Sequence, residues 1–222
     1  MKALEAHDLY RFYHVEEEEI LALKGVSLHV DVKEIVAVQG PSGSGKSTLL
    51  WCIAGLDEPD GGYVALSGNR VTRKSEPARA ALRARLIGIM LQSGNLFDHL
   101  SVEGNILLQM RLAGKKASRH RLSLLLEMVG LSSVRHSFPS QISGGEAARA
   151  GLAVAISAEP AVLLADEPTG EVDAETEKMI LKLLDDYRRG GGSVLVVTHS
   201  DAVASYADRV IRLFDGKVVT DD

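Results

Sequence analysis

The sequence predicts an α/β protein built around a mainly parallel β-sheet with helices on both faces, and three observations support this class. Hydrophobic residues make up 45% of the 222 residues and charged residues 25%, the balance of a globular domain. Short apolar runs alternate with helical stretches, which is the pattern of a parallel sheet with helical connections. A glycine-rich segment directly follows the first run and opens a helix, as in phosphate-binding α/β proteins. The expected strands are "IVAV" at 35–38, "IGIML" at 87–91, "AVLLA" at 161–165 and "VLVV" at 194–197.

The two ends of the chain are expected to form antiparallel β-structure. "KALEAHDLYRFY" at 2–13 and "ILALKGVSLHV" at 20–30 partly alternate apolar and polar residues, as strands with one solvated face do. The acidic run Glu16–Glu19 between them is expected to be a solvated loop. Asp215-Gly216 suits a type I′ turn, so "VIRLFDGKVV" is expected to form a hairpin.

The stretch from about 95 to 157 has a different pattern. "VEGNILLQMRLAG" and "RHRLSLLLEMVGL" have helical periodicity, and no convincing strand lies near them. We therefore expect one domain, residues 1–222, in which an α-helical subdomain at approximately 95–157 is inserted into the α/β core.

Composition limits the partners of the chain. The formal net charge is −5, so no overall basic field attracts nucleic acid, and we expect no nucleic-acid partner. Cys52 is the single cysteine, which excludes an internal disulfide, agrees with a reducing compartment and is expected to be a core residue. The N-terminus lacks the apolar stretch of a signal peptide, and no run approaches the ~18 apolar residues that span a bilayer. We expect a cytoplasmic protein that does not itself insert into a membrane.

The segment "GPSGSGKST", Gly40 to Thr48, matches the phosphate-binding pattern G-x-x-x-x-G-K-[ST]. Its glycines allow backbone N–H groups to surround phosphate oxygens. Lys46 can reach the β- and γ-phosphates, and Ser47 can bind Mg²⁺. A simple Gly-Ser turn is the structural alternative, but a strand before the motif and a helix after it favour nucleotide binding.

Polar side chains end three of the expected strands. "AVLLADEP" places Asp166 and Glu167 at a strand's carboxyl end, where open α/β sheets bind ligands. Asp166 is expected to hold Mg²⁺ directly or through water, and Glu167 to polarise an attacking water as a general base. Gln92 and His199 end two further strands and are candidates to contact the water, the metal or the γ-phosphate. Each of these residues alone is more often structural.

The segment "QISGGEAARAG" at 141–151 predicts a helix start, because Ser143 and Glu146 have the spacing of a capping box. Gly144 and Gly145 are poor helix formers and cost roughly 1 kcal/mol each relative to alanine. A ligand that approaches the backbone closely would explain them, since a helix N-terminus favours an anion.

Together, in this order, these residues resemble the ATP-binding cassette (ABC) ATPases across nearly the whole chain. The resemblance implies a Walker A loop made of Gly40, Pro41, Ser42, Gly43, Ser44, Gly45, Lys46, Ser47 and Thr48. It implies that Gln92 belongs to the Q-loop, Ile142–Glu146 to the signature, Asp166 and Glu167 to Walker B, Gly170–Asp173 to the D-loop, and that His199 is the switch histidine. Tyr13 falls where the family has its adenine-stacking aromatic residue, although Tyr10 and Phe12 lie close by.

The resemblance also implies a mechanism. It predicts a RecA-like P-loop core with an N-terminal antiparallel β subdomain and an inserted α-helical subdomain. ATP and Mg²⁺ are the expected ligands, with Lys46, Gln92, Glu167 and His199 catalytic and Ser47, Gln92 and Asp166 on the metal. Two copies are expected to pack head to tail, so that Ser143, Gly144, Gly145, Glu146 and Asp173 of one copy contact the ATP bound to the other.

The amino-acid sequences of several segments, such as "LLADEPTGEVD", resemble those of the macrolide-exporter and lipoprotein-releasing ATPases, which serve membrane permeases of the FtsX type. We expect such a permease to hold the chain at the inner face of the plasma membrane and to contact the region "NLFDHLSVEGN" at 95–105. A complex that transmits force or a signal without moving a solute would need the same catalytic residues. DNA-repair cassettes would add a long coiled coil, and translation-factor relatives a second cassette; the sequence has no sustained heptad run and one cassette.

Four residues depart from the usual family pattern. Lys33 stands where a turn commonly has glycine, which costs roughly 1–2 kcal/mol if φ is positive there. Ala147 and Ala148 replace a polar pair after the signature, and Val154 replaces a frequent arginine. We expect activity to persist, since Lys46 and the other catalytic candidates are present.

Overall fold

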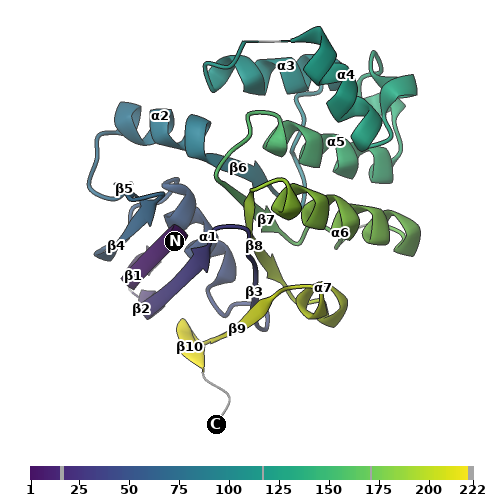
Figure 1. Cartoon of the computed structure of the whole chain (residues 1–222). Helices are drawn as coiled ribbons and strands as arrows, with labels where there is room; N and C mark the ends of the chain where they lie inside the picture. The colour runs from purple at the N-terminus through teal and green to yellow at the C-terminus, as the bar shows by residue number, and fades with distance from the viewer. Residues whose placement is uncertain (16–17, 117, 171, 220–222) are drawn as a thin grey trace.

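The computed structural model describes residues 1–15, 18–116, 118–170 and 172–219 (Figure 1). Its strands form a four-stranded sheet and a six-stranded sheet, with most helices gathered on one side of the larger sheet. In chain order the elements are β1 (Lys2–Val15), β2 (Glu18–Asp31), β3 (Ile35–Gln39), α1 (Lys46–Ala54), β4 (Gly61–Leu66), β5 (Asn69–Arg70), α2 (Glu76–Leu86), β6 (Ile87–Met90), α3 (Val102–Leu112), α4 (Arg119–Met128), the 3₁₀ turns η1 (Ser132–Val134) and η2 (Pro139–Gln141), α5 (Gly144–Ile156), β7 (Val162–Asp166), α6 (Ala174–Arg189), β8 (Ser193–Thr198), α7 (Asp201–Ser205), β9 (Arg209–Phe214) and β10 (Lys217–Val219).

The six-stranded sheet has the order β10-β9-β3-β8-β7-β6, and all neighbours except β9 and β10 are parallel. The four apolar runs form β3, β6, β7 and β8, so the predicted α/β class is confirmed. Gln39 pairs with Thr198, and Asp166 pairs with Val197. Because parallel strands end at one edge of a sheet, the segments that follow β3, β7 and β8 meet there.

The two faces of this sheet are covered differently, because successive residues of a strand point to opposite sides. Val36, Leu164 and Leu195 lie in a core that also includes residues of α1 and of the four-stranded sheet. Leu163 and Val194 lie in a second core with residues of α3, α4, α5 and α6. Helices therefore cover both faces as predicted, but on the first face α1 is accompanied by the smaller sheet. Burying each of these side chains contributes about 1.5–3 kcal/mol.

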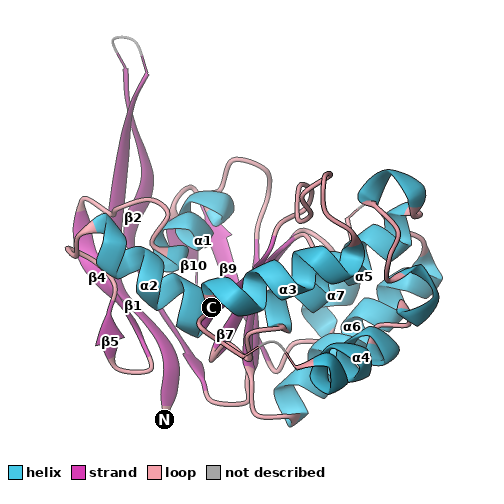
Figure 2. Cartoon of the chain, turned by 90° about the horizontal axis from the view of Figure 1, so that it is seen from above, coloured by secondary structure: helices cyan, strands magenta, loops and turns pink. Residues whose placement is uncertain are grey.

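Both predicted antiparallel regions are present. β1 and β2 pair along their length in the four-stranded sheet, and Figure 2 shows this hairpin projecting from the rest of the molecule. The loop expected at Glu16–Glu19 is corrected in part: Glu18 and Glu19 belong to β2 and pair with Val15 and His14, while 16–17 lie outside the described residues. At the turn between β9 and β10, Asp215 and Gly216 have φ of 45° and 71°, as a type I′ turn requires.

The regular secondary structure described between residues 95 and 157 is helical. α3 and α4 lie in the two predicted helical stretches, α5 begins at the signature, and no strand occurs among the described residues of this range. The hydroxyls of Ser101 and Ser118 cap α3 and α4 by accepting the N–H groups of Gly104 and Arg121. Within the described part of the chain, no helix has both the length and the apolar character that crossing a bilayer requires.

Candidate functional site

The phosphate loop between β3 and α1 is packed between two strands at positions that only glycine fits. Gly45 has φ of 100°, and a Cβ on it would lie 2.6 Å from the carbonyl oxygen of Ala22 in β2. A Cβ on Gly40 would lie 2.1 Å from the carbonyl oxygen of Leu213 in β9. A side chain at either glycine would therefore push the loop away from its support.

Two sets of hydrogen bonds hold this loop. The Lys46 ammonium donates to the carbonyl oxygens of Gly40, at 2.8 Å, and Pro41, at 2.9 Å. A phosphate would compete for this ammonium as a charged acceptor. In addition, the N–H of Gly216 in the β9–β10 turn donates to the carbonyl oxygen of Ser44 at 3.0 Å. The loop is therefore ordered by the protein itself.

One cavity of about 760 Å³ lies between the phosphate loop and the carboxyl ends of β7 and β8. Gly40, Pro41 and Ser44 belong to the loop but are not among the described residues that line the cavity. The predicted site residues that the cavity brings together are Tyr13, Ser42, Gly43, Gly45, Lys46, Ser47, Thr48, Gln92, Asp166, Glu167 and His199.

Glu167 is held by two neighbours at the end of the adjacent strand. The Thr198 hydroxyl donates to Glu167 Oε2 at 3.0 Å, and His199 Nδ1 lies 2.7 Å from Glu167 Oε1. The Glu167 side chain is 13% exposed, whereas that of His199 is 72% exposed, so the imidazole covers the carboxylate from the solvent side. Glu167 also has φ of 45°, a conformation that costs roughly 1–3 kcal/mol outside glycine and is concentrated at functional sites.

Asp166 lies beside Ser47 in an environment that suits a cation. Burial raises the pKa of Asp166, the neighbouring Glu167 raises it further, and the Ser47 hydroxyl and Lys46 oppose the shift. Within the described ranges, no three His, Cys, Asp or Glu side chains are grouped to hold a metal by themselves. Mg²⁺ is usually bound by one or two carboxylates together with substrate phosphates and water. This hydroxyl and carboxylate therefore fit Mg²⁺ bound jointly with a nucleotide.

Tyr13 of β1 also lines this cavity. Its hydroxyl donates to Asp57 Oδ2 at 2.7 Å, and the Arg11 guanidinium lies 4.7 Å from the ring centroid. Burial raises the pKa of Tyr13, and the hydrogen bond to Asp57 adds to the increase. The ring of Tyr10, another of the three aromatic candidates, lies instead beside Gly25 and Gly61.

The signature residues form a separate group at the exposed start of α5. Ser143 Oγ accepts the N–H of Glu146 at 3.3 Å, and Glu146 Oε2 accepts the N–H of Ser143 at 2.8 Å, so the capping box is present. The Ser143 N–H, and then the Ser143 hydroxyl, which donates to the same carboxylate oxygen at 2.9 Å, lower the pKa of Glu146. A Cβ on Gly145 would lie 2.7 Å from Thr176 Oγ1, whereas one on Gly144 would meet nothing within 4 Å. Close packing inside the chain therefore accounts for Gly145.

The D-loop ends at the N-terminus of α6, next to the signature. Asp173 caps this helix by accepting the N–H groups of Glu175 and Thr176 at 3.0 and 2.9 Å, and Asp173 Oδ2 also accepts the Thr176 hydroxyl. These contacts lower the pKa of Asp173. Residue 171 of the predicted D-loop lies outside the described residues. Thr176 thus joins the D-loop to Gly145.

An asparagine that the motif analysis missed organises the segment around Gln92. Asn95 Oδ1 accepts the Leu91 N–H at 2.7 Å, and its amide donates to the Leu91 carbonyl oxygen at 2.6 Å. A Cβ on Gly151 of α5 would lie 2.8 Å from Asn95 Cβ, so the loop packs directly on that helix. Gln92 lines the nucleotide cavity and also a cavity of about 270 Å³ beside Gly144. Asparagine shortly after a strand is a turn signal that could have indicated this role.

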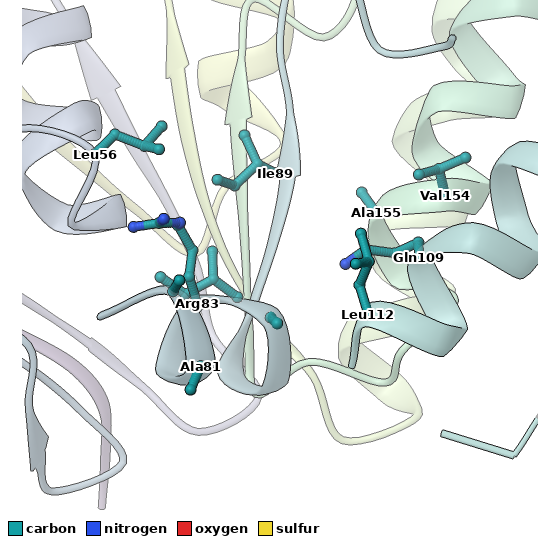
Figure 3. Close-up of a pocket in the computed structure, with 11 residues that line it drawn as sticks. Leu56, Ala81, Arg83, Ile89, Gln109, Leu112, Val154 and Ala155 are labelled. Atoms are coloured by element: carbon teal, nitrogen blue, oxygen red, sulfur yellow. The ribbon is translucent and has the colours of Figure 1, made fainter. Parts of the chain in front are cut away.

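The structure shows where the four residues that depart from the family pattern lie. Lys33 has φ of 64°, the positive value under which its cost of roughly 1–2 kcal/mol applies. Ala147 and Ala148 line the cavity beside Gln92. Val154 lines a groove of about 510 Å³ between α2 and the pair α3 and α5, where Figure 3 shows it across from Leu56 and Arg83.

This fold, with its phosphate loop and paired strand-end acids, defines the class of ATP-binding cassette ATPases. The family model described as ABC transporter matches residues 23–170, and the chain belongs to that family. It is an ATP-binding domain of this family and an ATPase.

Individual relatives cover almost the whole chain. A macrolide export ATP-binding/permease protein MacB of Chlorobium luteolum is 41% identical over 98% of this chain, and the chain spans 33% of that relative's length. An ABC transporter ATP-binding protein of Thermotoga maritima is 39% identical over 98% of this chain and 94% of its own. A methionine import ATP-binding protein MetN of Thermobifida fusca is 41% identical over 97% of this chain and 68% of its own. The chain therefore spans about a third of the macrolide-export relative.

Solved cassette structures have the same fold. The dimeric structure of the ATP-binding cassette MJ0796 in a post-hydrolysis state, bound to ADP and Pi, has a TM-score of 0.91 and 33% identity, covering 99% of this chain and 97% of its own. A second dimeric structure of MJ0796 also has a TM-score of 0.91. The predicted architecture, with an antiparallel β subdomain and helices around an α/β core, is thereby confirmed.

Proposed function

We propose that this chain hydrolyses ATP in the cavity between the phosphate loop and the ends of β7 and β8. The observation that carries the proposal is that one cavity contains Lys46, Ser47, Asp166 and the Glu167–His199 pair. The backbone of Gly40–Thr48 would surround the phosphates, and Lys46 would exchange its carbonyl partners for β- and γ-phosphate oxygens.

Glu167 would act as the general base. Thr198 and His199 orient its two carboxylate oxygens, and each oxygen retains a second lone pair that can accept a proton from the attacking water. His199, on the solvent side of the carboxylate, would contact the γ-phosphate when its ring turns from Glu167 toward the cavity. Gln92 would help to place the water.

Mg²⁺, when bound, neutralises charge that develops on the transferred phosphoryl group. Ser47 and Asp166 would hold it, with Gln92 as a further oxygen ligand. Asp166 supports this assignment, because burial and Glu167 disfavour its negative charge until a cation is present.

We further propose a head-to-tail homodimer. Ser143 is exposed at the start of α5, and it is not among the described residues that line the nucleotide cavity. A second copy would bring its own Ser143, Gly144, Gly145 and Glu146 to the γ-phosphate, with Asp173 nearby. The dimeric state of the similar cassette MJ0796 supports this arrangement. Each chain would then contribute two complementary half-sites.

The membrane partner would be a permease of the FtsX type, which would hold the chain at the cytoplasmic face of the plasma membrane. The macrolide-export relatives, whose name includes a permease, support this choice, although the methionine-import relatives have comparable identity. We place the permease contact at the helical subdomain, around residues 95–105 and the adjoining groove. Leu112, Val154 and Ile89 make that groove largely apolar (Figure 3).

Affinity purification tests the partner. Glu167→Gln protein would be isolated from its own membranes with ATP and Mg²⁺, and co-purifying membrane chains identified by mass spectrometry; Lys46→Ala protein is the control for nucleotide dependence. We expect a permease with few spans and a large extracytoplasmic domain, recovered with Glu167→Gln only. A permease with many spans would move the chain to the import group, and recovery of no membrane chain would contradict the transporter role.

A further inference from the structure

Two charged residues surround the ring of Tyr13, which lines the nucleotide cavity. Tyr13 pairs with Ile20 across the β1–β2 hairpin, and both residues line the cavity. Arg11 covers one face of the Tyr13 ring, with its guanidinium carbon 4.7 Å from the centroid. The opposite face is therefore the one left for a nucleotide base.

Asp57 binds both members of this stack at once. Its Oδ2 accepts the Tyr13 hydroxyl at 2.7 Å and Arg11 Nε at 2.8 Å, while its Oδ1 pairs with Arg11 Nη2 at 2.8 Å. The Arg11 and Asp57 side chains are only 21% and 22% exposed. A bidentate, largely buried arginine–carboxylate pair has a fixed geometry, unlike a single contact between exposed side chains.

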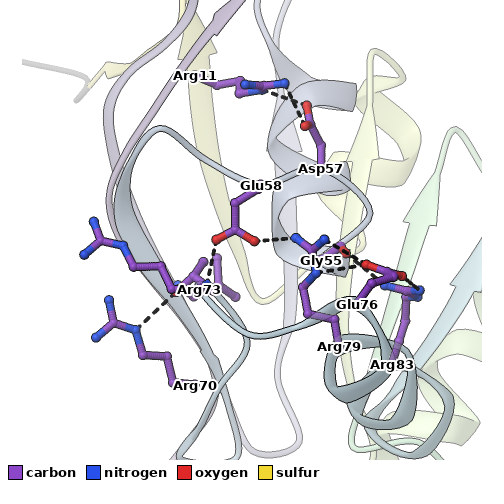
Figure 4. A network of polar contacts seen from close by, with 11 residues as sticks. Arg11, Gly55, Asp57, Glu58, Arg70, Arg73, Glu76, Arg79 and Arg83 are labelled. Atoms are coloured by element: carbon purple, nitrogen blue, oxygen red, sulfur yellow. Dashed lines mark hydrogen bonds and ion pairs between the residues drawn. The ribbon is translucent and has the colours of Figure 1, made fainter.

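The loop that carries Asp57 is itself tied down. This loop follows α1. Figure 4 shows that Gly55 and Glu58, which lie on either side of Asp57 in the sequence, are bound to α2 and to the segment that precedes α2. Arg83 donates to the carbonyl oxygen of Gly55 at 2.8 Å, Glu58 accepts the Arg73 N–H at 2.6 Å, and Glu58 pairs with Arg79. Asp57 therefore projects toward Tyr13 from a braced position.

We propose that Asp57 is a positioning residue for nucleotide binding, which holds the Tyr13 ring against Arg11 so that its free face receives the base. This inference rests on the proposed ATP site. The physical gain is preorganisation: a side chain that is already fixed loses less rotamer freedom when the ligand binds. Asp57 itself does not touch the nucleotide and acts only through Tyr13 and Arg11.

A pair of ligands with and without a base tests this role on the full chain. Calorimetric titration with Mg-ADP, and displacement of it by Mg-tripolyphosphate, would be compared for the parent and Asp57→Asn. We expect Asp57→Asn to weaken ADP about fivefold and to change tripolyphosphate affinity by less than about twofold. Asp60→Asn is the matched control, because Asp60 pairs with Arg11 at 3.1 Å without contacting Tyr13; both affinities should stay within about twofold of the parent.

Tyr13→Phe keeps the test decisive if Asp57→Asn does not fold. It removes only the hydroxyl that Asp57 accepts, so it should weaken ADP to a similar extent, and the double variant should be no weaker than either single one. Unchanged ADP affinity in Tyr13→Phe, or equal loss of ADP and tripolyphosphate in Asp57→Asn, would overturn the inference. Lys46→Ala separates this failure from that of the proposed function: if it leaves ADP affinity unchanged, the nucleotide does not occupy this cavity at all.

Discussion

The nucleotide cavity and the start of the signature helix each hold a carboxylate beside a serine, and the two carboxylates are perturbed in opposite directions. In the cavity, burial and the proximity of Glu167 raise the pKa of Asp166. At the start of α5, the backbone N–H of Ser143 and then its hydroxyl lower the pKa of Glu146. The cavity therefore disfavours negative charge on Asp166 until a cation is present, whereas the start of α5 stabilises negative charge on Glu146.

The difference shows that one chain carries two separate sites where negative charge is handled differently. In the cavity, a metal ion would neutralise the acidic side chains, and the phosphates of a nucleotide would bind to the phosphate loop. At the signature, the N–H and the hydroxyl of Ser143, which could bind an anion, both donate to the carboxylate of Glu146. The proposed head-to-tail dimer would bring these complementary surfaces together, and the following substitutions test each side separately.

The largest effect is expected in the cavity. Glu167→Gln removes the proposed base and should lower kcat for Mg-ATP roughly a thousandfold, the scale of general-base catalysis. Thr198→Val is the matched control, since it removes one hydrogen bond to Glu167 and leaves the carboxylate; its loss should be roughly tenfold. Phosphate release measures both. Equal turnover in Glu167→Gln and the parent would contradict the role of Glu167.

The signature should matter for turnover without affecting the first binding step. Ser143→Arg places a large side chain at the start of α5 and removes a proposed phosphate ligand, so we expect turnover to fall at least about a hundredfold. Nucleotide affinity of the monomer, measured with ADP by calorimetry, should stay within about twofold. A comparable loss of ADP affinity would mean that Ser143 belongs to the same chain's nucleotide cavity.

The two signature glycines should respond differently to alanine. Gly145→Ala brings a methyl group against Thr176 and should lower the free energy of unfolding by about 1–2 kcal/mol. Gly144→Ala meets open space and should leave it within about 1 kcal/mol of the parent. Urea unfolding of both variants measures the difference. If Gly144→Ala is as stable as expected yet inactive, close approach of a ligand explains Gly144.

The smallest effect concerns pH. The folded chain lowers the pKa of Glu146 from its ordinary 4.5, so the ionised side chain stabilises the fold above that pH. The contribution is lost as the pH falls through the folded-state pKa. We therefore expect Glu146→Gln to be less stable than the parent at pH 7 and the gap to close in acid. A gap that widens on acidification would contradict this sign.

Sequence patterns predicted what is encoded locally. The strands β3, β7 and β8 are continuous apolar runs, and the phosphate loop has its glycines and Lys46 in one segment. Helix α2 was not predicted, because its apolar residues are mainly small alanines and none of its residues is fully buried. The acids at Glu18 and Glu19 suggested a loop, yet pairing with β1 extends the strand through them.

The missed parts of the site depend on contacts between distant segments. Gly145 needs its small size because of Thr176, and Tyr13 is held by Asp57; no spacing rule connects either pair. Thr198 precedes the predicted His199, but its bond to Glu167 follows from the parallel register of β7 and β8. Such contacts become visible only when the strands are placed side by side.

The hydrogen bond from Gly216 to Ser44 also bears on the order of events during synthesis. The phosphate loop leaves the ribosome early, but the turn on which it rests is made much later. At ~5–20 residues per second, the interval is roughly ten seconds or more. Throughout that time the phosphate loop of the nascent chain lacks its hydrogen bond to Gly216, so this part of its support forms only after most of the two hydrophobic cores has been synthesised.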